Sequence, residues 1–205
     1  YQVFPDRFAS SGADRRPPPW AIPASWDDPP LVFGEEAMAQ LFGGDLPGIE
    51  RHLDHIERLG ANALYLTPFF PGESNHRYNA SSFDEVDPVL GGDEALAALV
   101  AAAHRRGIQV LGDLTVNHCG STHPWFRRAV EDPQSIEATF FFRAGTAFEY
   151  WQGVPTLPKF DHRSPELRHR LYEGPDSVAA RWLRPPFELD GWRIDVANMA
   201  GRLRD

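Results

Sequence analysis

The sequence predicts an α/β fold built on a parallel sheet, because four short apolar runs alternate with helical segments and long loops along its 205 residues. Strands separated by helices favour right-handed βαβ connections and therefore parallel pairing. Polar side chains also follow each run, as they do at the carboxyl ends of parallel strands in α/β enzymes. Four such units make half of a (β/α)8 barrel. A doubly wound sheet is the alternative, although its usual G-x-G-x-x-G loop does not occur in this sequence.

The expected strands are apolar runs too short for helices of ordinary length. The loop after the first run is rich in proline and glycine and too long for an ordinary βα connection, so we expect it to be functional or mobile. The expected strands are residues 1–5, 63–68, 108–116 and 191–196.

Three segments are expected to be helical. In residues 45–60, apolar side chains recur every three or four positions, Asp45 can cap the start and a glycine can end the helix. Residues 91–107 show the same spacing and also end at a glycine. The third segment, residues 164–183, opens with Ser164 as a cap and a proline in its first turn.

Aromatic and turn residues without a long period fill residues 119–163, so we expect an inserted subdomain there. Residues 1–118 then hold the first three strands with the helices between them. Residues 164–205 hold the next helix and the fourth strand.

The composition excludes some classes of binding partner. A net charge of −9 argues against nucleic acid as a partner, because its phosphates favour basic protein surfaces. We find no apolar run of the roughly 18 residues that a membrane span needs, so we expect no membrane partner. Cys119 is the only cysteine, which rules out an internal disulfide. His118, Cys119 and His123 lie close together but match no metal-site spacing, so we expect no metal and no cofactor.

A charged pair stands in the fourth expected strand, where buried charges need partners. Arg193 and Asp195 are two positions apart and therefore point to the same face, so the arginine would stabilise the ionised carboxylate. Asp113, in the third strand, could complete the network, because one guanidinium can donate to more than one carboxylate. Such a pair by itself is more often structural than catalytic.

Several segments of the chain together resemble the α-amylase superfamily, glycoside hydrolase family 13. DLTVNH, residues 113–118, resembles the family's first conserved region, LPKFD, residues 157–161, its fifth, and GWRIDVANM, residues 191–199, its second. The resemblance spans essentially the whole chain. It implies the N-terminal half of a TIM barrel, strands 1 to 4, with a subdomain inserted after strand 3.

The resemblance also implies a role for individual residues. Asp195 matches the nucleophile that attacks the anomeric carbon, and Arg193 matches the residue that orients it. Asp113 and Asn117 match structural supports of the site. The implied substrate contacts are hydroxyl donors at His76 and His118, a stacking ring at Tyr78, and leaving-group contacts at Asn198 and Met199.

Finer features of the resemblance point to a group within the family. Lys159 stands where calcium-dependent α-amylases carry Asp, which is similar to neopullulanases and cyclomaltodextrinases. Met199 stands where those enzymes usually carry Glu and looks more like maltodextrin glucosidase. Both acids that often follow the stacking tyrosine are replaced, since Asn79 comes next and Ser82 follows three residues later. Trp151 fits the subdomain core and a sugar platform about equally well.

The expected function is therefore retaining hydrolysis of α-1,4 links in maltodextrins, with α-1,6 links as a further candidate. The expected partner is an α-glucan oligosaccharide, the expected location is cytoplasmic, and a homo-oligomer is left open. The family's general acid is a Glu after the fifth strand, and no glutamate of this sequence matches its motif, so we expect an incomplete fragment that is inactive alone. A transglycosylase or isomerase of the superfamily and a non-catalytic amylase-like subunit are the alternatives.

Overall fold

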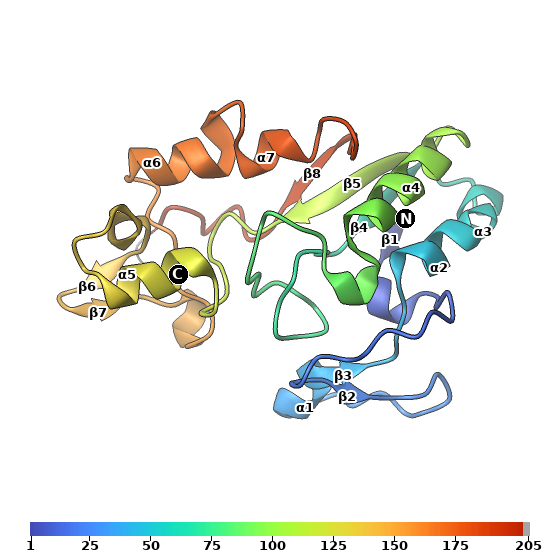
Figure 1. Cartoon of the computed structure of the whole chain (residues 1–205), viewed down its shortest axis with the longest axis horizontal. Coiled ribbons are helices and arrows are strands. Elements are labelled where there is room, and N and C mark those ends of the chain that lie inside the picture. Colours follow the sequence, from blue (N-terminus) through green and yellow to red (C-terminus); the bar gives the residue numbers. More distant parts are fainter. Residues whose placement is uncertain (203–205) are drawn as a thin grey trace.

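The computed structural model describes residues 1–202 and contains a four-stranded parallel sheet (Figure 1). Its strands are β1 (Gln2–Val3), β4 (Ala63–Leu66), β5 (Gln109–Leu114) and β8 (Gly191–Ile194). They lie side by side in the same order as along the chain. A doubly wound sheet reverses its strand order at a switch point, whereas a barrel adds each strand next to the previous one. The strand order therefore confirms half of a TIM barrel.

Helices connect these strands and cover one face of the sheet. The connecting helices are α2 (Leu46–Arg51), α3 (Leu53–Arg58), η2 (Pro88–Leu90), α4 (Gly92–His104), α6 (Pro165–Arg168), a π-helical turn η5 (His169–Glu173) and α7 (Val178–Arg181). In β4, Leu64 and Leu66 are fully buried while Tyr65 between them is only partly so. One face of the sheet therefore packs in the core, and the other is the interior face of the half barrel.

The pairing of β5 with β8 depends on a glycine. Gly112 lies opposite Trp192 in the register, and a Cβ on Gly112 would approach the Trp192 ring to 2.6 Å. The Trp192 indole N–H donates to the Ala179 carbonyl at 3.0 Å. Trp192 thus packs between sheet and helices, and Asp113 and Arg193, the next pair in the register, face the barrel interior.

The helix predicted over residues 45–60 is two helices, because His52 leaves the helical backbone at φ −112° and ψ 16°. The His52 ring contacts the Gly48 carbonyl through Nδ1 at 2.8 Å, in the place of the backbone N–H that an unbroken helix would use. A side chain that satisfies a carbonyl in this way competes with the helix.

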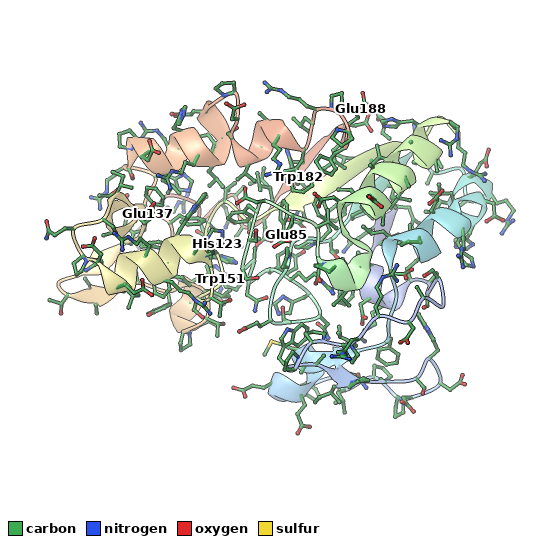
Figure 2. The ribbon with its side chains drawn as sticks, in the orientation of Figure 1. Glu85, His123, Glu137, Trp151, Trp182 and Glu188 are labelled. Atoms are coloured by element: carbon green, nitrogen blue, oxygen red, sulfur yellow. The ribbon has the colours of Figure 1, made fainter. Side chains whose placement is uncertain are left out.

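The helix predicted over residues 164–183 is also interrupted. It breaks after η5, where Pro175 offers no backbone N–H. Ser177 then accepts the Ala180 N–H and caps a new helix, α7. Trp182, next to α7, is fully buried and donates to the Phe83 carbonyl at 3.1 Å, which ties this helix to the loop after β4 (Figure 2).

The subdomain inserted after β5 has its own small elements and an aromatic core. They are α5 (Pro124–Glu131), η3 (Ile136–Phe140), β6 (Arg143–Ala144), β7 (Ala147–Phe148) and η4 (Trp151–Gly153). Phe126, Phe140 and Phe141 are buried. Isolated antiparallel bridges join His118 to Lys159 and Phe141 to Phe160, so the subdomain is attached to the loop that leaves β5. The residue limits 1–118, 119–163 and 164–205 stay a prediction, and residues 203–205 lie outside the described part.

The long loop after β1 folds into an arm that projects from the sheet (Figure 1). After a turn, η1 (Pro5–Arg7), the arm carries β2 (Ile22–Pro23), α1 (Gly34–Ala39) and β3 (Gln40–Leu41). Asp6, buried beside the end of β1, accepts N–H groups of Phe42 and Gly43 at 3.0 to 3.1 Å and holds the base of the arm. Within residues 1–202, none of the helices combines the length and apolar character needed to cross a bilayer.

Candidate active site

A guanidinium between two carboxylates lies at the carboxyl ends of β5 and β8. Arg193 Nη1 donates to Asp195 Oδ1 at 2.6 Å and to both oxygens of Asp113, at 3.2 and 3.0 Å. The Asp113 side chain is fully buried, while that of Asp195 keeps 13% of its surface exposed. The network that the sequence left open between Asp113, Arg193 and Asp195 is therefore formed.

Two tyrosines complete the surroundings of Asp113. The hydroxyls of Tyr65 on β4 and of Tyr78 both donate to Asp113 Oδ2, the latter at 3.0 Å. Burial raises the pKa of Asp113, and the hydrogen bond from Tyr65 and the charge of Arg193 oppose that rise. Burial also raises the pKa of Tyr78 to about 12, so its hydroxyl remains a donor at neutral pH.

Tyr65 is a site residue that the sequence reasoning missed. The signal was present, because Tyr65 alternates with the buried Leu64 and Leu66 in a strand and must face the barrel interior. A hydroxyl on that face needs a partner when the strand is buried, and Asp113 on the next strand provides it.

The charge of Arg193 is held by its neighbours. Burial would lower the pKa of Arg193, but the charge of Asp113 and the hydrogen bond to Asp195 raise it above the ordinary value. Asp195 therefore has a permanent cation beside Oδ1, and Oδ2 accepts no hydrogen bond from any residue in 1–202. One carboxylate oxygen is oriented and the other is available for chemistry.

His76 and Tyr78 form a stacked pair in the loop after β4. Their ring centroids are 5.8 Å apart with an interplanar angle of 29°, and the Tyr78 backbone N–H donates to His76 Nδ1 at 3.1 Å. This contact assigns the ring proton to Nε2. Burial and then the neighbouring Arg77 charge lower the pKa of His76 to about 4, while Asp195 acts in the opposite direction. His76 is therefore a neutral N–H donor close enough to Asp195 to sense its charge.

A second group of site residues connects the inserted subdomain to the turn after β8. The Asn117 side-chain amide donates to His118 Nδ1 at 3.1 Å, and the His118 ring stacks on Trp151 with centroids 5.4 Å apart. The Trp151 indole N–H reaches Met199 Sδ at 3.2 Å. Trp151, labelled in Figure 2, thus links the predicted site residues His118 and Met199.

Asn198 is the predicted site residue that the structure does not bring into these contacts. Its side chain is exposed and makes no hydrogen bond to another residue within 1–202.

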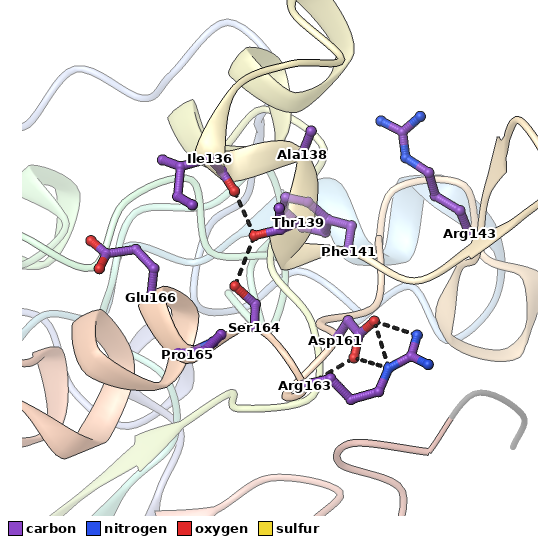
Figure 3. A pocket seen from close by; sticks show the side chains of 10 residues that line it. All are labelled: Ile136, Ala138, Thr139, Phe141, Arg143, Asp161, Arg163, Ser164, Pro165 and Glu166. Atoms are coloured by element: carbon purple, nitrogen blue, oxygen red, sulfur yellow. Dashed lines mark hydrogen bonds and ion pairs between the residues drawn. The ribbon is translucent and has the colours of Figure 1, made fainter.

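A cavity of about 690 Å³ lies elsewhere, between the inserted subdomain and α6 (Figure 3). Four of its polar side chains are paired with one another, Arg163 with Asp161 at 2.6 Å and Thr139 with Ser164 at 2.8 Å. None of the predicted site residues lines it. This cavity is therefore not part of the site at the strand ends.

The histidines and cysteine weighed above as a metal site have other roles. His123 Nδ1 accepts the Trp125 N–H at 3.1 Å and caps α5, and burial lowers its pKa to about 3. Cys119 is fully buried, which raises the pKa of its thiol. No group of three or more metal-ligating side chains occurs within residues 1–202, and the expectation of a metal-free site stays a prediction.

The sequence profile described as "Alpha amylase, catalytic domain" matches residues 2–205. The chain belongs to the α-amylase family. Similar proteins include a cyclomaltodextrinase from a Bacillus species. It is 36% identical to this chain over 97% of the chain and 35% of the relative. Another, named intracellular maltogenic amylase, from Bacillus subtilis, is 34% identical over 97% of the chain and 32% of the relative.

A solved structure shares both sequence and fold with this chain of the α-amylase family. It is the cyclic α-maltosyl-(1→6)-maltose hydrolase from Arthrobacter globiformis in complex with its cyclic saccharide, 36% identical, with a TM-score of 0.80 over 97% of the chain and 44% of that structure. These matches confirm the resemblance to the cyclomaltodextrinase group. The chain spans about a third of the length of the curated relatives it matches.

Proposed function

We propose that the protein containing this chain is a retaining glycoside hydrolase that cleaves α-1,4 links in maltodextrins, with Asp195 as its nucleophile. The observation that carries the proposal is the position of Asp195 at the interior end of β8, with one oxygen held by Arg193 and the other available. Membership of the α-amylase family supports it. Two relatives are named cyclomaltodextrinase and cyclic α-maltosyl-(1→6)-maltose hydrolase.

The proposed chemistry has two steps. Asp195 Oδ2 attacks the anomeric carbon while the bond from that carbon to the glycosidic oxygen breaks, and a general acid protonates the departing oxygen. Water then hydrolyses the glycosyl ester, with the same acid acting as base. In retaining enzymes the two carboxyl groups stand about 5–5.5 Å apart. We place the acid in the rest of the protein, because no glutamate of this sequence matches the family's motif.

The remaining residues are proposed to bind the sugar at the cleavage point. The Tyr78 ring supplies a flat apolar surface for a sugar face. His76, through Nε2–H, and His118 donate to hydroxyls, while Met199 and Asn198 contact the leaving-group side. Arg193 orients the nucleophile, and Asp113 and Asn117 support Arg193 and His118 through the hydrogen bonds described above. Cleavage of α-1,6 links is a second specificity to test.

Substitution of Asp195 by Asn in the full-length protein tests the nucleophile. The amide keeps the shape but cannot form the glycosyl ester, so we expect turnover of maltotriose to fall at least about a thousandfold while binding persists. Asp84→Asn, the same chemical change at a side chain that is 83% exposed, is the matched control. A turnover for Asp195→Asn within tenfold of wild type would contradict the proposal.

Product analysis separates the alternatives. Oligosaccharides longer than maltotriose among the products of the wild-type protein would indicate a transglycosylase. Absence of turnover in the wild type would indicate a non-catalytic subunit. A cytoplasmic location is proposed as well, supported by the name of the Bacillus subtilis relative, and cell fractionation of the source organism tests it.

A further inference from the structure

Arg77 is a charged residue with a completely buried side chain, between the proposed sugar contacts His76 and Tyr78. Its Nε donates to Asp87 Oδ2 at 2.6 Å and its Nη1 to the Asn75 carbonyl at 2.8 Å. Removing a guanidinium from water is costly, and an apolar side chain often serves stability equally well. The burial of Arg77 therefore calls for an explanation beyond stability.

The backbone of Arg77 is also unusual. Its φ is +58°, in the left-handed region that side chains other than glycine seldom occupy. The Arg77 N–H donates to Ser74 Oγ at 3.0 Å, and the same hydroxyl lies 3.2 Å from His76 Nδ1. Strained backbone of this kind persists only where surrounding contacts hold it. Here it directs Arg77 into the interior while the rings of His76 and Tyr78 stack at the site.

Asp87, the partner of Arg77 in the ion pair, is itself held in place by hydrogen bonds. Its backbone N–H donates to the Phe69 carbonyl at 2.9 Å, and its Oδ1 accepts the Val89 N–H at 2.9 Å. Asp87 is thus tied to the segment that leaves β4. Through Asp87, Arg77 connects the loop that carries His76 and Tyr78 to the sheet.

From this geometry we propose that Arg77 is a positioning residue, whose buried ion pair with Asp87 holds the left-handed turn that aims His76 and Tyr78 at Asp113 and Asp195. The inference rests on the proposed glycosidase function, because the two rings are its sugar contacts. Arg77 itself touches no substrate in this proposal.

The charge of Arg77 adds an electrostatic effect. His76 faces two charged groups that act in opposite directions, since Arg77 lowers its pKa and Asp195 raises it. Burial, the larger cause of the low pKa, would remain without the guanidinium, so loss of Arg77 should raise the pKa of His76 only in part. Arg77 therefore extends the pH range in which His76 stays neutral and can accept the Tyr78 N–H at Nδ1.

The test uses Arg77→Met and Arg77→Lys in the full-length protein, with maltotriose as substrate. We expect Arg77→Met to lower kcat/KM about a hundredfold, chiefly through a higher KM. A displacement of substrate-binding side chains by about 1 Å can have an effect of that size. We also expect the acid limb of its pH profile to move to higher pH. Arg77→Lys should restore the acid limb but not KM, because an ammonium keeps the charge without the two-nitrogen geometry.

Controls separate positioning from stability and from failure of the proposed function. Leu99→Ala removes a fully buried side chain from α4 and should lower Tm without changing KM or the pH profile. If Arg77→Met does not fold, Asp87→Asn tests the same ion pair and should raise KM.

NMR titration of His76 needs no turnover and should show a pKa higher in Arg77→Met than in wild type. The proposal would be overturned if Arg77→Met had the same KM, pH profile and His76 pKa as Leu99→Ala. If the wild type were inactive but the His76 pKa were higher in Arg77→Met, the result would count against the glycosidase function alone.

Discussion

At the scale of single residues, the site depends on buried polar groups that receive several partners each. Asp113 accepts hydrogen bonds from Tyr65, Tyr78 and Arg193, which together offset the cost of burying a carboxylate. Asp113 in turn holds Arg193 next to Asp195. A fully buried residue thus sets the position of the proposed nucleophile.

Burial of His123 predicts a specific pH dependence of stability. Its pKa of about 3 in the folded protein lies below its ordinary value of 6.5, and only burial causes the shift, since Phe83 and Trp125 pack around the ring. The unfolded chain therefore binds a proton that the folded protein does not between these two pH values. The free energy of unfolding should fall as the pH drops from about 6.5 toward 3, by about 1.4 kcal/mol per pH unit for this residue.

His123→Asn tests this pH dependence, because asparagine can still cap α5 but does not titrate. We expect the loss of unfolding free energy between pH 7 and pH 5 to be about 2 kcal/mol smaller in the variant than in wild type. Urea denaturation of the full-length protein at the two pH values measures it. Equal losses in both proteins would show that His123 does not remain neutral.

At the scale of elements, the site is built where the inserted subdomain meets the sheet. The loop after β5 is bridged to the subdomain through His118 and Lys159, and Trp151 in η4 reaches Met199 in the turn after β8. Aromatic stacking and an N–H to sulfur contact are each weak, but together they set the position of the His118 ring.

Trp151→Ala in the full-length protein should therefore lower kcat/KM for maltotriose about threefold to tenfold, since a stacked ring pair contributes roughly 0.5–1.5 kcal/mol. Trp26→Ala is the matched control, because Trp26 lies on the projecting arm and is 47% exposed. An effect of Trp151→Ala no larger than that of Trp26→Ala would show that the subdomain contact does not position the site.

At the scale of the whole molecule, the described sheet has two edges, β1 and β8. Strand edges with unpaired backbone groups favour association with other chains. The Arg193 side chain, which faces the interior of the half barrel, is 44% exposed, and Ile194, on the opposite face of β8, is 39% exposed. A closed barrel would cover this interior with side chains from further strands.

We therefore expect the 205-residue polypeptide, produced alone, to associate in solution and to release no glucose from maltotriose. Loss of the proton donor, which we propose to lie in the rest of the protein, by itself removes about 10²–10⁴-fold in rate. Size-exclusion chromatography, a thermal melt and a glucose assay check these points. A sharp monomer peak with a cooperative melt would contradict the expected association, and glucose release above background would contradict the need for the rest of the protein.

The sequence by itself determined the succession of strands and helices and most of the candidate site residues. Hydrophobic spacing and turn residues act locally, so four strands and the positions of Arg193 and Asp195 two residues apart could be recognised without a structure. The family resemblance then distinguished a barrel from a doubly wound sheet, and the strand order agrees with it. It did not reveal the break at His52, because a side chain that competes for one carbonyl leaves the helical spacing unchanged.

Only the tertiary structure decided which side chains meet. The register of β5 against β8 places Asp113 opposite Arg193, and the neighbouring β4 brings in Tyr65, a residue without any motif of its own. The burial of Arg77 and its pairing with Asp87 likewise depend on how the loop folds back on the end of β4. These contacts join residues far apart in the chain, and their energies come from burial and partner geometry, which the local pattern of the sequence does not contain.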